Sequence, residues 1–278
     1  MTARRPTDAG PATHGTEIHL ILIWSNARSH AERIIADIAS QFVVREVVSL
    51  AWTPERFSEN LTRFYGTHLP PQSEKERHCG TAPFLLIVVE DSRPVYRRRW
   101  TNRGWATVNT ALFDAKLRYR RWAESAYVVH TSDTRGEAAH DLFFLLGRRP
   151  SSWTDDRGLW DGTIEERSAD VMGADGWTTF DELLEAIRLV TPCAVSAGLT
   201  EDTVDLVVDD VWWAEVIANG RRVGGDRSIS VVSVAGRDVV VRLQASGRRV
   251  REPSRIVHWL RPLVAGFRAA LQSFRGGR

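Results

Sequence analysis

Apolar runs and amphipathic segments alternate along the first half of the chain, which predicts strands and helices in turn. Four apolar runs have the length and composition of buried strands, and they cover residues 18–24, 42–50, 83–89 and 127–130. Helices are predicted where apolar residues recur every three or four positions, over residues 29–38, 53–64 and 134–146. The Ser/Thr-x-x-Glu patterns that begin at Ser29 and Thr134, and Thr53 before Pro54, are typical helix starts.

This order of elements suits one α+β architecture. A β-α-β-α-β order, followed by an insertion and then a last strand and helix, predicts a ferredoxin-like antiparallel sheet with helices on one face. Two segments interrupt the regular pattern. Residues 66–80 read as a polar loop, and the basic and aromatic residues 97–121 are predicted to be irregular or helical.

A second smaller α/β domain is predicted after residues 147–160, which are rich in glycine, proline, serine and charge. Its predicted elements are a helix that begins at Thr179, a helix over 210–219, and strands at 193–197, 204–208, 228–234 and 239–243. Residues 256–274 form an amphipathic helix with a basic flank, which packs on its own domain or lies on an anionic membrane. The expected divisions are a disordered tail (1–16), a first domain (17–147), a linker (148–162) and a second domain (163–278).

Composition narrows the class of protein. The chain has 278 residues, 43% hydrophobic and 26% charged, which suits one or two globular domains. It has no run of about 18 apolar residues that would span a membrane, and its polar first residues lack a signal-peptide core. Two cysteines, Cys79 and Cys193, suggest neither a disulfide framework nor a zinc site and fit a reducing cytoplasm. The net charge of +2 favours no polyanion, and the arginine-rich basic content is typical of a bacterial GC-rich genome.

Candidate chemistry lies at the end of the fourth predicted strand. There His130 follows an apolar run and precedes a polar turn and a helix, so it is held by rigid elements and yet reachable. Asp141, eleven residues on, lies where it could reach back to the imidazole. A phosphohistidine nucleophile needs this arrangement, with one ring nitrogen free to attack and the other oriented by a hydrogen bond. A surface histidine on an ordinary strand-turn-helix remains the alternative.

The segment resembles the nucleoside diphosphate kinase family. That family carries an apolar strand, His-Gly-Ser-Asp-Ser, and a helix with an acid eleven residues past the histidine. The resemblance places the phosphorylated histidine at His130, its hydroxyl partner at Ser132 and the orienting carboxylate at Asp141. The turn acid corresponds to Asp133 and the first-turn glutamate to Glu137.

The resemblance covers roughly residues 17–147 and is strongest over 127–146, with weaker matches at 80–84, 101–104 and 113–114. It implies the ferredoxin-like fold, phosphotransfer through a phosphohistidine, and Mg²⁺ bound with a nucleotide. The family's first strand ends in Lys-Pro-Asp, whose lysine contacts the transferred phosphate, whereas here Trp24 is followed by Ser25 and Asn26.

Positive charge for a phosphate is therefore expected from arginine, which binds phosphate with two parallel hydrogen bonds. The candidates are Arg99, Arg103 and Arg118, and at least one of them is expected to point into the His130 pocket. Thr81 is a further candidate phosphate contact, because it follows Gly80 directly before a buried strand. The adjacent His78 and Cys79 do not suit cysteine-histidine catalysis, since neighbouring residues of an extended chain point to opposite faces.

The second half weakly resembles nucleotidyltransferase-fold domains, which carry a Gly-Ser turn and an Asp-x-Asp pair on a strand. Here residues 196–198 supply the turn, but Thr203 stands in place of the first acid and only Asp205 remains. The later strand, 239–243, has no carboxylate in its body. Because two-metal chemistry needs two or three converging carboxylates, we expect no catalytic metal site here and a silent domain. A generic α/β domain is the alternative.

The sequence thus predicts a histidine-dependent phosphotransferase that acts on a nucleotide or a phosphorylated small metabolite in the cytoplasm. The alternative is a non-catalytic nucleotide-binding or scaffolding protein derived from two nucleotide-handling domains. Arginine alternates with aromatic residues at 97–100 and 118–122, as on nucleic-acid-binding surfaces. The low net charge argues against nucleic acid as the main partner. The oligomeric state and the phosphoryl acceptor stay open.

Overall fold

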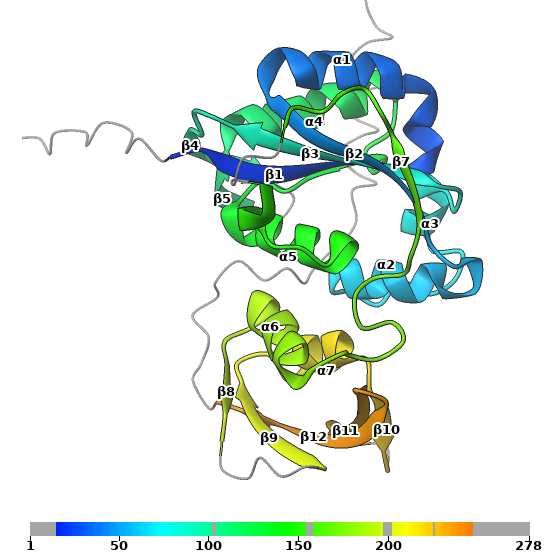
Figure 1. Ribbon diagram of the computed structural model, residues 1–278, viewed down its shortest axis with the longest axis vertical. Helices are drawn as coiled ribbons and strands as arrows, with labels where there is room; N and C mark the ends of the chain where they lie inside the picture. The colour runs from blue at the N-terminus through cyan, green and yellow to red at the C-terminus, as the bar shows by residue number, and fades with distance from the viewer. Residues whose placement is uncertain (1–14, 102–103, 154–157, 197–201, 225, 247–278) are drawn as a thin grey trace, which may run out of the picture.

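A computed structural model describes residues 15–101, 104–153, 158–196, 202–224 and 226–246, which form a mixed α+β structure. The described residues contain two five-stranded sheets and one two-stranded hairpin (Figure 1). Most of the predicted tail, Arg103 and the predicted helix over 256–274 lie outside the described residues. No described helix has the length and apolar character needed to cross a bilayer.

The first sheet has the strand order β6-β1-β3-β2-β7. Its strands are β1 (Glu17–Ile23), β2 (Val43–Ala51), β3 (Phe84–Asp91), β6 (Val129–Thr131) and β7 (Glu165–Ser168). The pairs β6–β1, β1–β3 and β3–β2 are antiparallel, which matches the predicted ferredoxin-like order. β7 adds a parallel strand beside β2 that the sequence pattern did not predict.

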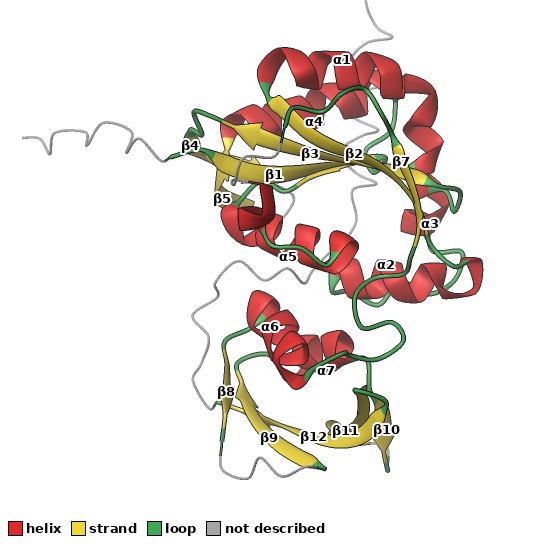
Figure 2. Cartoon of the chain, in the orientation of Figure 1, coloured by secondary structure: helices red, strands yellow, loops and turns green. Residues whose placement is uncertain are grey.

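Helices cover both faces of this sheet, so the expectation of helices on one face is corrected (Figure 2). One face is covered by α1 (Ala31–Gln41) and α4 (Thr110–Trp122), and the other by α2 (Phe57–Tyr65) and α5 (Arg135–Leu146). The reason lies in β1, all seven of whose residues are buried. Alternate side chains of a strand point to opposite faces, so a continuous apolar run needs cover on both.

Two connecting segments differ from the sequence predictions. The segment predicted as irregular or helical folds into the antiparallel hairpin β4 (Tyr96–Thr101) and β5 (Gly104–Asn109), followed by α4. The predicted polar loop contains a short helix, α3 (Glu74–Cys79).

Two of the three predicted helix starts contain a 3-10 turn, and the third has the predicted side-chain cap. The 3-10 turn η1 (Ser25–His30) takes the place of the capping box predicted at Ser29. The cap predicted at Thr134 is present, and its Oγ1 accepts a hydrogen bond from the Glu137 backbone N–H at 3.1 Å. A 3-10 turn, η2 (Pro54–Arg56), precedes α2.

The second sheet has the order β10-β11-β12-β9-β8, with α6 and α7 against one face (Figure 1). Its elements are α6 (Phe180–Val190), β8 (Cys193–Val195), β9 (Thr203–Val208), α7 (Val211–Ala218), β10 (Arg221–Val223), β11 (Asp226–Val234) and β12 (Arg237–Ala245). β9 pairs in parallel with β12 and the other pairs are antiparallel. α6 begins with a complete capping box at Thr179, as the sequence predicts.

One continuous apolar cluster joins the two halves, with α2 and α5 packed against α6 and α7. Trp213 on α7 is 2% exposed and packs against Gly66, which ends α2 in a left-handed conformation (φ 61°). A Cβ at Gly66 would lie 1.9 Å from the Trp213 ring, so glycine is required there. The predicted domain boundaries stay predictions, but the described parts of both halves share this core.

Part of the predicted linker also packs on the first sheet. The 3-10 turn η3 (Pro150–Trp153) ends at Trp153, which is 1% exposed. Its Nε1–H donates to Oε2 of Glu46 on β2 at 2.7 Å. The chain after α5 is therefore attached to the first sheet by Trp153 and then by β7.

Candidate functional site

His130 is the middle residue of β6, the edge strand that pairs with β1 opposite Leu22. Its side chain lies on the α2 and α5 side of the sheet, where the rings of Phe64 and Tyr65 pack against it edge to face. The distances between ring centroids are 5.5 Å to Phe64 and 5.9 Å to Tyr65. The side chain is 18% exposed. The imidazole is thus held by packing and still reachable from solvent.

Asp141 on α5 orients this imidazole, as the eleven-residue spacing predicts. His130 Nε2–H donates to Asp141 Oδ2 at 2.7 Å, and the carboxylate is 3% exposed. An ionised carboxylate can only accept, so Nε2 carries the proton and the neutral ring keeps a lone pair on Nδ1. Nδ1 has no hydrogen-bond partner among the described residues. One nitrogen is therefore fixed and the other is available to a substrate.

A second histidine shares the same carboxylate. His140 Nδ1–H donates to Asp141 Oδ1 at 3.0 Å, and its ring packs against Phe64, Phe144 and the second half's Trp213. Burial raises the pKa of Asp141, but the two imidazoles outweigh it and bring the pKa to about 2. Asp141 is consequently an anion at every physiological pH.

The turn acids fix the loop between β6 and α5 and do not contact the imidazole. Glu137 Oε2 accepts from the Asp133 backbone N–H at 2.8 Å, and the Asp133 carboxylate binds Lys116 and Thr131. Asp141, and neither of the turn acids, is the carboxylate that binds His130.

Ser132 is not brought to His130. It is fully buried, and its Oγ accepts from the Leu20 backbone N–H at 2.8 Å and lies 3.4 Å from His19 Nδ1. The hydroxyl thus fastens the end of β6 to β1. The hydroxyl role expected from the family resemblance has no geometric support at this position.

The arginines expected to enter the His130 pocket lie elsewhere. Arg118 bonds Asp37 on α1 at 2.5 Å, on the face of the sheet opposite to His130. Arg99 is on the hairpin, 3.6 Å from Asp114. Arg118 lies on the side of α4 that faces α1, and its neighbour Tyr119 donates to the same Asp37 carboxylate, which explains the position of Arg118. Arg103 lies outside the described residues.

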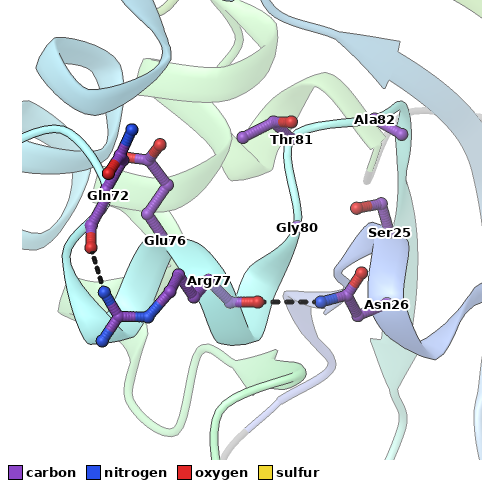
Figure 3. Close-up of a pocket in the computed structure, with 8 residues that line it drawn as sticks. All are labelled: Ser25, Asn26, Gln72, Glu76, Arg77, Gly80, Thr81 and Ala82. Carbon is purple, nitrogen blue, oxygen red and sulfur yellow. Dashed lines mark hydrogen bonds between the residues drawn. The ribbon is translucent and has the colours of Figure 1, made fainter.

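Thr81 lies in a separate surface hollow of about 400 Å³ between η1 and the end of α3 (Figure 3). The hollow is lined by Ser25, Asn26, Gln72, Glu76, Arg77, Gly80, Thr81 and Ala82. Several of these groups bind one another, since Asn26 Nδ2 donates to the Arg77 carbonyl at 2.9 Å and Arg77 binds the Gln72 carbonyl. His130 is not part of its lining.

Two cations that the sequence analysis did not single out contact residues that adjoin His130. Lys75 on α3 has its Nζ 4.2 Å from the ring centre of Tyr65 and 5.1 Å from that of Tyr127. Burial lowers the pKa of Lys75 to about 8. Arg120 donates from Nε to the Val129 carbonyl, next to His130, at 2.8 Å, and burial lowers its pKa as well.

A signal for Lys75 was present in the sequence. The chain has 37 lysines and arginines, and only Lys75 and Lys116 are lysines.

Cys79, on the same helix as Lys75, is buried, and burial raises the pKa of its thiol to about 11. That thiol is therefore a poor nucleophile near neutral pH.

In the second half, Oδ1 of Asp205 on β9 lies 3.6 Å from Nη1 of Arg242 on the neighbouring β12. Thr203 occupies the position two residues earlier, on the same face of the strand. Over the described ranges there is no group of three or more histidine, cysteine or acidic residues that could hold a metal ion.

Comparison with known proteins adds little to this geometry. No family model matches the chain, and no curated protein matches it. Among solved structures, the nucleoside diphosphate kinase of Aquifex aeolicus aligns with 46% of this chain and 93% of its own, at 16% identity and a TM-score of 0.31. Arguments about function therefore depend on the side chains described above.

Proposed function

We propose that the first half of the chain is a phosphotransferase in which His130 accepts a phosphoryl group from a nucleotide or a phosphorylated small molecule. The observation that carries the proposal is the imidazole whose Nε2 is held by a buried carboxylate while Nδ1 is without a partner among the described residues. A nucleophilic histidine needs this division of roles.

The reaction follows from the protonation states. The Nδ1 lone pair attacks phosphorus, the bond from phosphorus to the leaving oxygen breaks, and that oxygen keeps the bonding pair. The imidazole gains positive charge, which the Asp141 carboxylate, 2.7 Å from Nε2, stabilises. Transfer to an acceptor oxygen reverses the same step and restores the neutral ring.

Lys75 and Arg120 are the cations proposed to stabilise the phosphate, in place of the arginines expected from the sequence. Phosphoryl transfer depends on positioning and positive charge. Mg²⁺, which the family resemblance implies, would be held by the phosphates of the nucleotide.

A second candidate, a non-catalytic nucleotide-binding or scaffolding protein, is favoured by one observation. Arg99 and Arg118 are both engaged by carboxylates, and Thr81 lies in a different hollow from His130. The phosphate site expected from the family resemblance is thus dispersed in this structure.

Labelling with γ-labelled nucleotide separates the two candidates. A phosphohistidine gives an acid-labile, alkali-stable protein label, which we expect in the wild type and not in His130→Asn. The matched control is His68→Asn, which changes an exposed histidine on the loop after α2 and should label normally. No label with nucleoside triphosphates or with small phosphate donors such as acetyl phosphate would support the non-catalytic candidate.

A further inference from the structure

The β4–β5 hairpin presents two tryptophans to solvent. The hairpin lies beside the beginning of β1 (Figure 1). Tyr96 of the hairpin donates from Oη–H to Oε2 of Glu17, the first residue of β1, at 2.5 Å. Trp100 and Trp105 stand directly opposite each other on the two strands and are 68% and 62% exposed. Their ring centroids are 5.7 Å apart with an interplanar angle of 77°, so ring faces remain open. We call these two residues the tryptophan pair.

One exposed arginine lies beside the tryptophan pair. Arg97 and Arg98 are exposed, and the Arg98 guanidinium lies 5.5 Å from the centre of the Trp105 ring. Alternation along β4 places Arg98 on the same face as Trp100, and Arg97 and Arg99 on the other. The described residues of the two strands include no aspartate or glutamate.

Two acidic side chains near the hairpin already have partners. Glu17 is buried and accepts hydrogen bonds from Tyr96 and Arg135, and Asp114 pairs with Arg99. Arg98 is thus an exposed charge beside the tryptophan pair, and a complementary partner brings negative charge together with flat apolar faces. A second copy of this hairpin packed against the first would place arginine against arginine.

We propose that this hairpin binds single-stranded nucleic acid, with bases stacked on the tryptophan pair and phosphates paired with Arg98 on the same face. Such sites combine aromatic rings, on which every base can stack, with a cationic track for the backbone. A duplex hides its base faces, so it can offer the hairpin only phosphates. The proposal is independent of His130, because the hairpin carries none of the residues assigned to phosphotransfer.

The test is a fluorescence-anisotropy titration of the full chain with labelled oligothymidylate, oligouridylate and a mixed-sequence duplex at two salt concentrations. We expect both single strands to bind more tightly than the duplex. Trp100→Ala with Trp105→Ala should weaken single-strand binding at least tenfold, and the matched Trp100→Phe with Trp105→Phe should retain most of it, because phenylalanine also stacks. Arg98→Ala should lower the slope of log affinity against log salt by about 0.7.

Each other outcome overturns the proposal. Absence of oligonucleotide binding, equal binding of the duplex, or alanine variants that bind like the wild type would each exclude the hairpin as a single-strand site. Tryptophan-dependent dimers in sedimentation or tryptophan-dependent binding to anionic vesicles, without oligonucleotide binding, would assign the surface to another partner. Phosphohistidine labelling of the tryptophan-to-alanine variant should be unchanged, which keeps this result separate from the proposed phosphotransfer.

Discussion

Replacing Asp141 by asparagine tests the central contact of the candidate site. The carboxylate accepts hydrogen bonds from two imidazoles, at 2.7 Å from His130 and 3.0 Å from His140, and is 3% exposed. An asparagine side chain of the same shape has one acceptor oxygen and no charge, so it can keep one of these bonds in neutral form.

Two calculations give a similar magnitude. A buried hydrogen bond to a charged group contributes about 1.5 to 3 kcal/mol, so the substitution should lower the free energy of unfolding by about 2 to 3 kcal/mol. The pKa of Asp141 falls from 3.8 to about 2 on folding. At about 1.4 kcal/mol per pH unit, this difference corresponds to about 2 to 3 kcal/mol of stability at neutral pH.

The pH dependence is the sharper readout. Because the folded pKa is the lower one, the contribution of Asp141 is complete above pH 3.8 and is lost as the pH falls toward 2. Urea unfolding, followed by circular dichroism from neutral pH to about pH 3, should therefore show the wild-type advantage over Asp141→Asn shrinking only in acid. The matched control is Asp181→Asn, an exposed first-turn carboxylate of α6, whose effect should be about 0.5 kcal/mol or less. An Asp141→Asn protein as stable as wild type at pH 7, or a difference that persists unchanged in acid, would refute the reasoning.

Three further predictions follow from other contacts. If Lys75 stabilises the phosphate, the rate of His130 labelling in the wild type should fall as the pH rises through about 8, where Lys75 loses its proton. Lys75→Ala should label at least tenfold more slowly, and the rate for Lys75→Arg should not change over this pH range. A wild-type rate that does not change with pH would exclude this role. Arg118→Ala should leave labelling unchanged and cost about 0.2 to 1 kcal/mol, because it removes a partly exposed pair with Asp37; a loss of label would contradict its placement on the opposite face. Trp213→Ala should cost about 3 to 5 kcal/mol, and circular dichroism and tryptophan fluorescence should still report one transition, whereas two separate transitions would show that the halves unfold independently.

The contact between His130 and Asp141 was predictable because it is local. A strand end, a capped turn and the first two turns of a helix fix the relative positions of residues eleven apart. The positions of the arginines were not predictable in this way. Arg118 depends on which face α4 packs and on Asp37, 81 residues earlier in the chain, so its partner is decided by tertiary packing.

Strands with apolar sequences were found and polar strands were missed. The sequence of β4, Tyr-Arg-Arg-Arg-Trp-Thr, and that of β7, Glu-Glu-Arg-Ser, have no apolar alternation, since each lies at an edge or in an exposed hairpin. Their pairing is determined by backbone hydrogen bonds, which leave no mark on the hydrophobic pattern. The continuous apolar runs, by contrast, predicted buried strands correctly but did not show that both faces of the sheet would be covered.

The attachment of Trp153 and β7 to β2 has a consequence for any shortened form of this protein. A fragment that stops at residue 147 would leave β2 as an open edge, with unpaired N–H and C=O groups beside the vacated place of Trp153. Open edges of this kind recruit strands from other molecules. Such a fragment should aggregate, whereas one carried through Ser168 keeps β2 paired with β7 of its own chain.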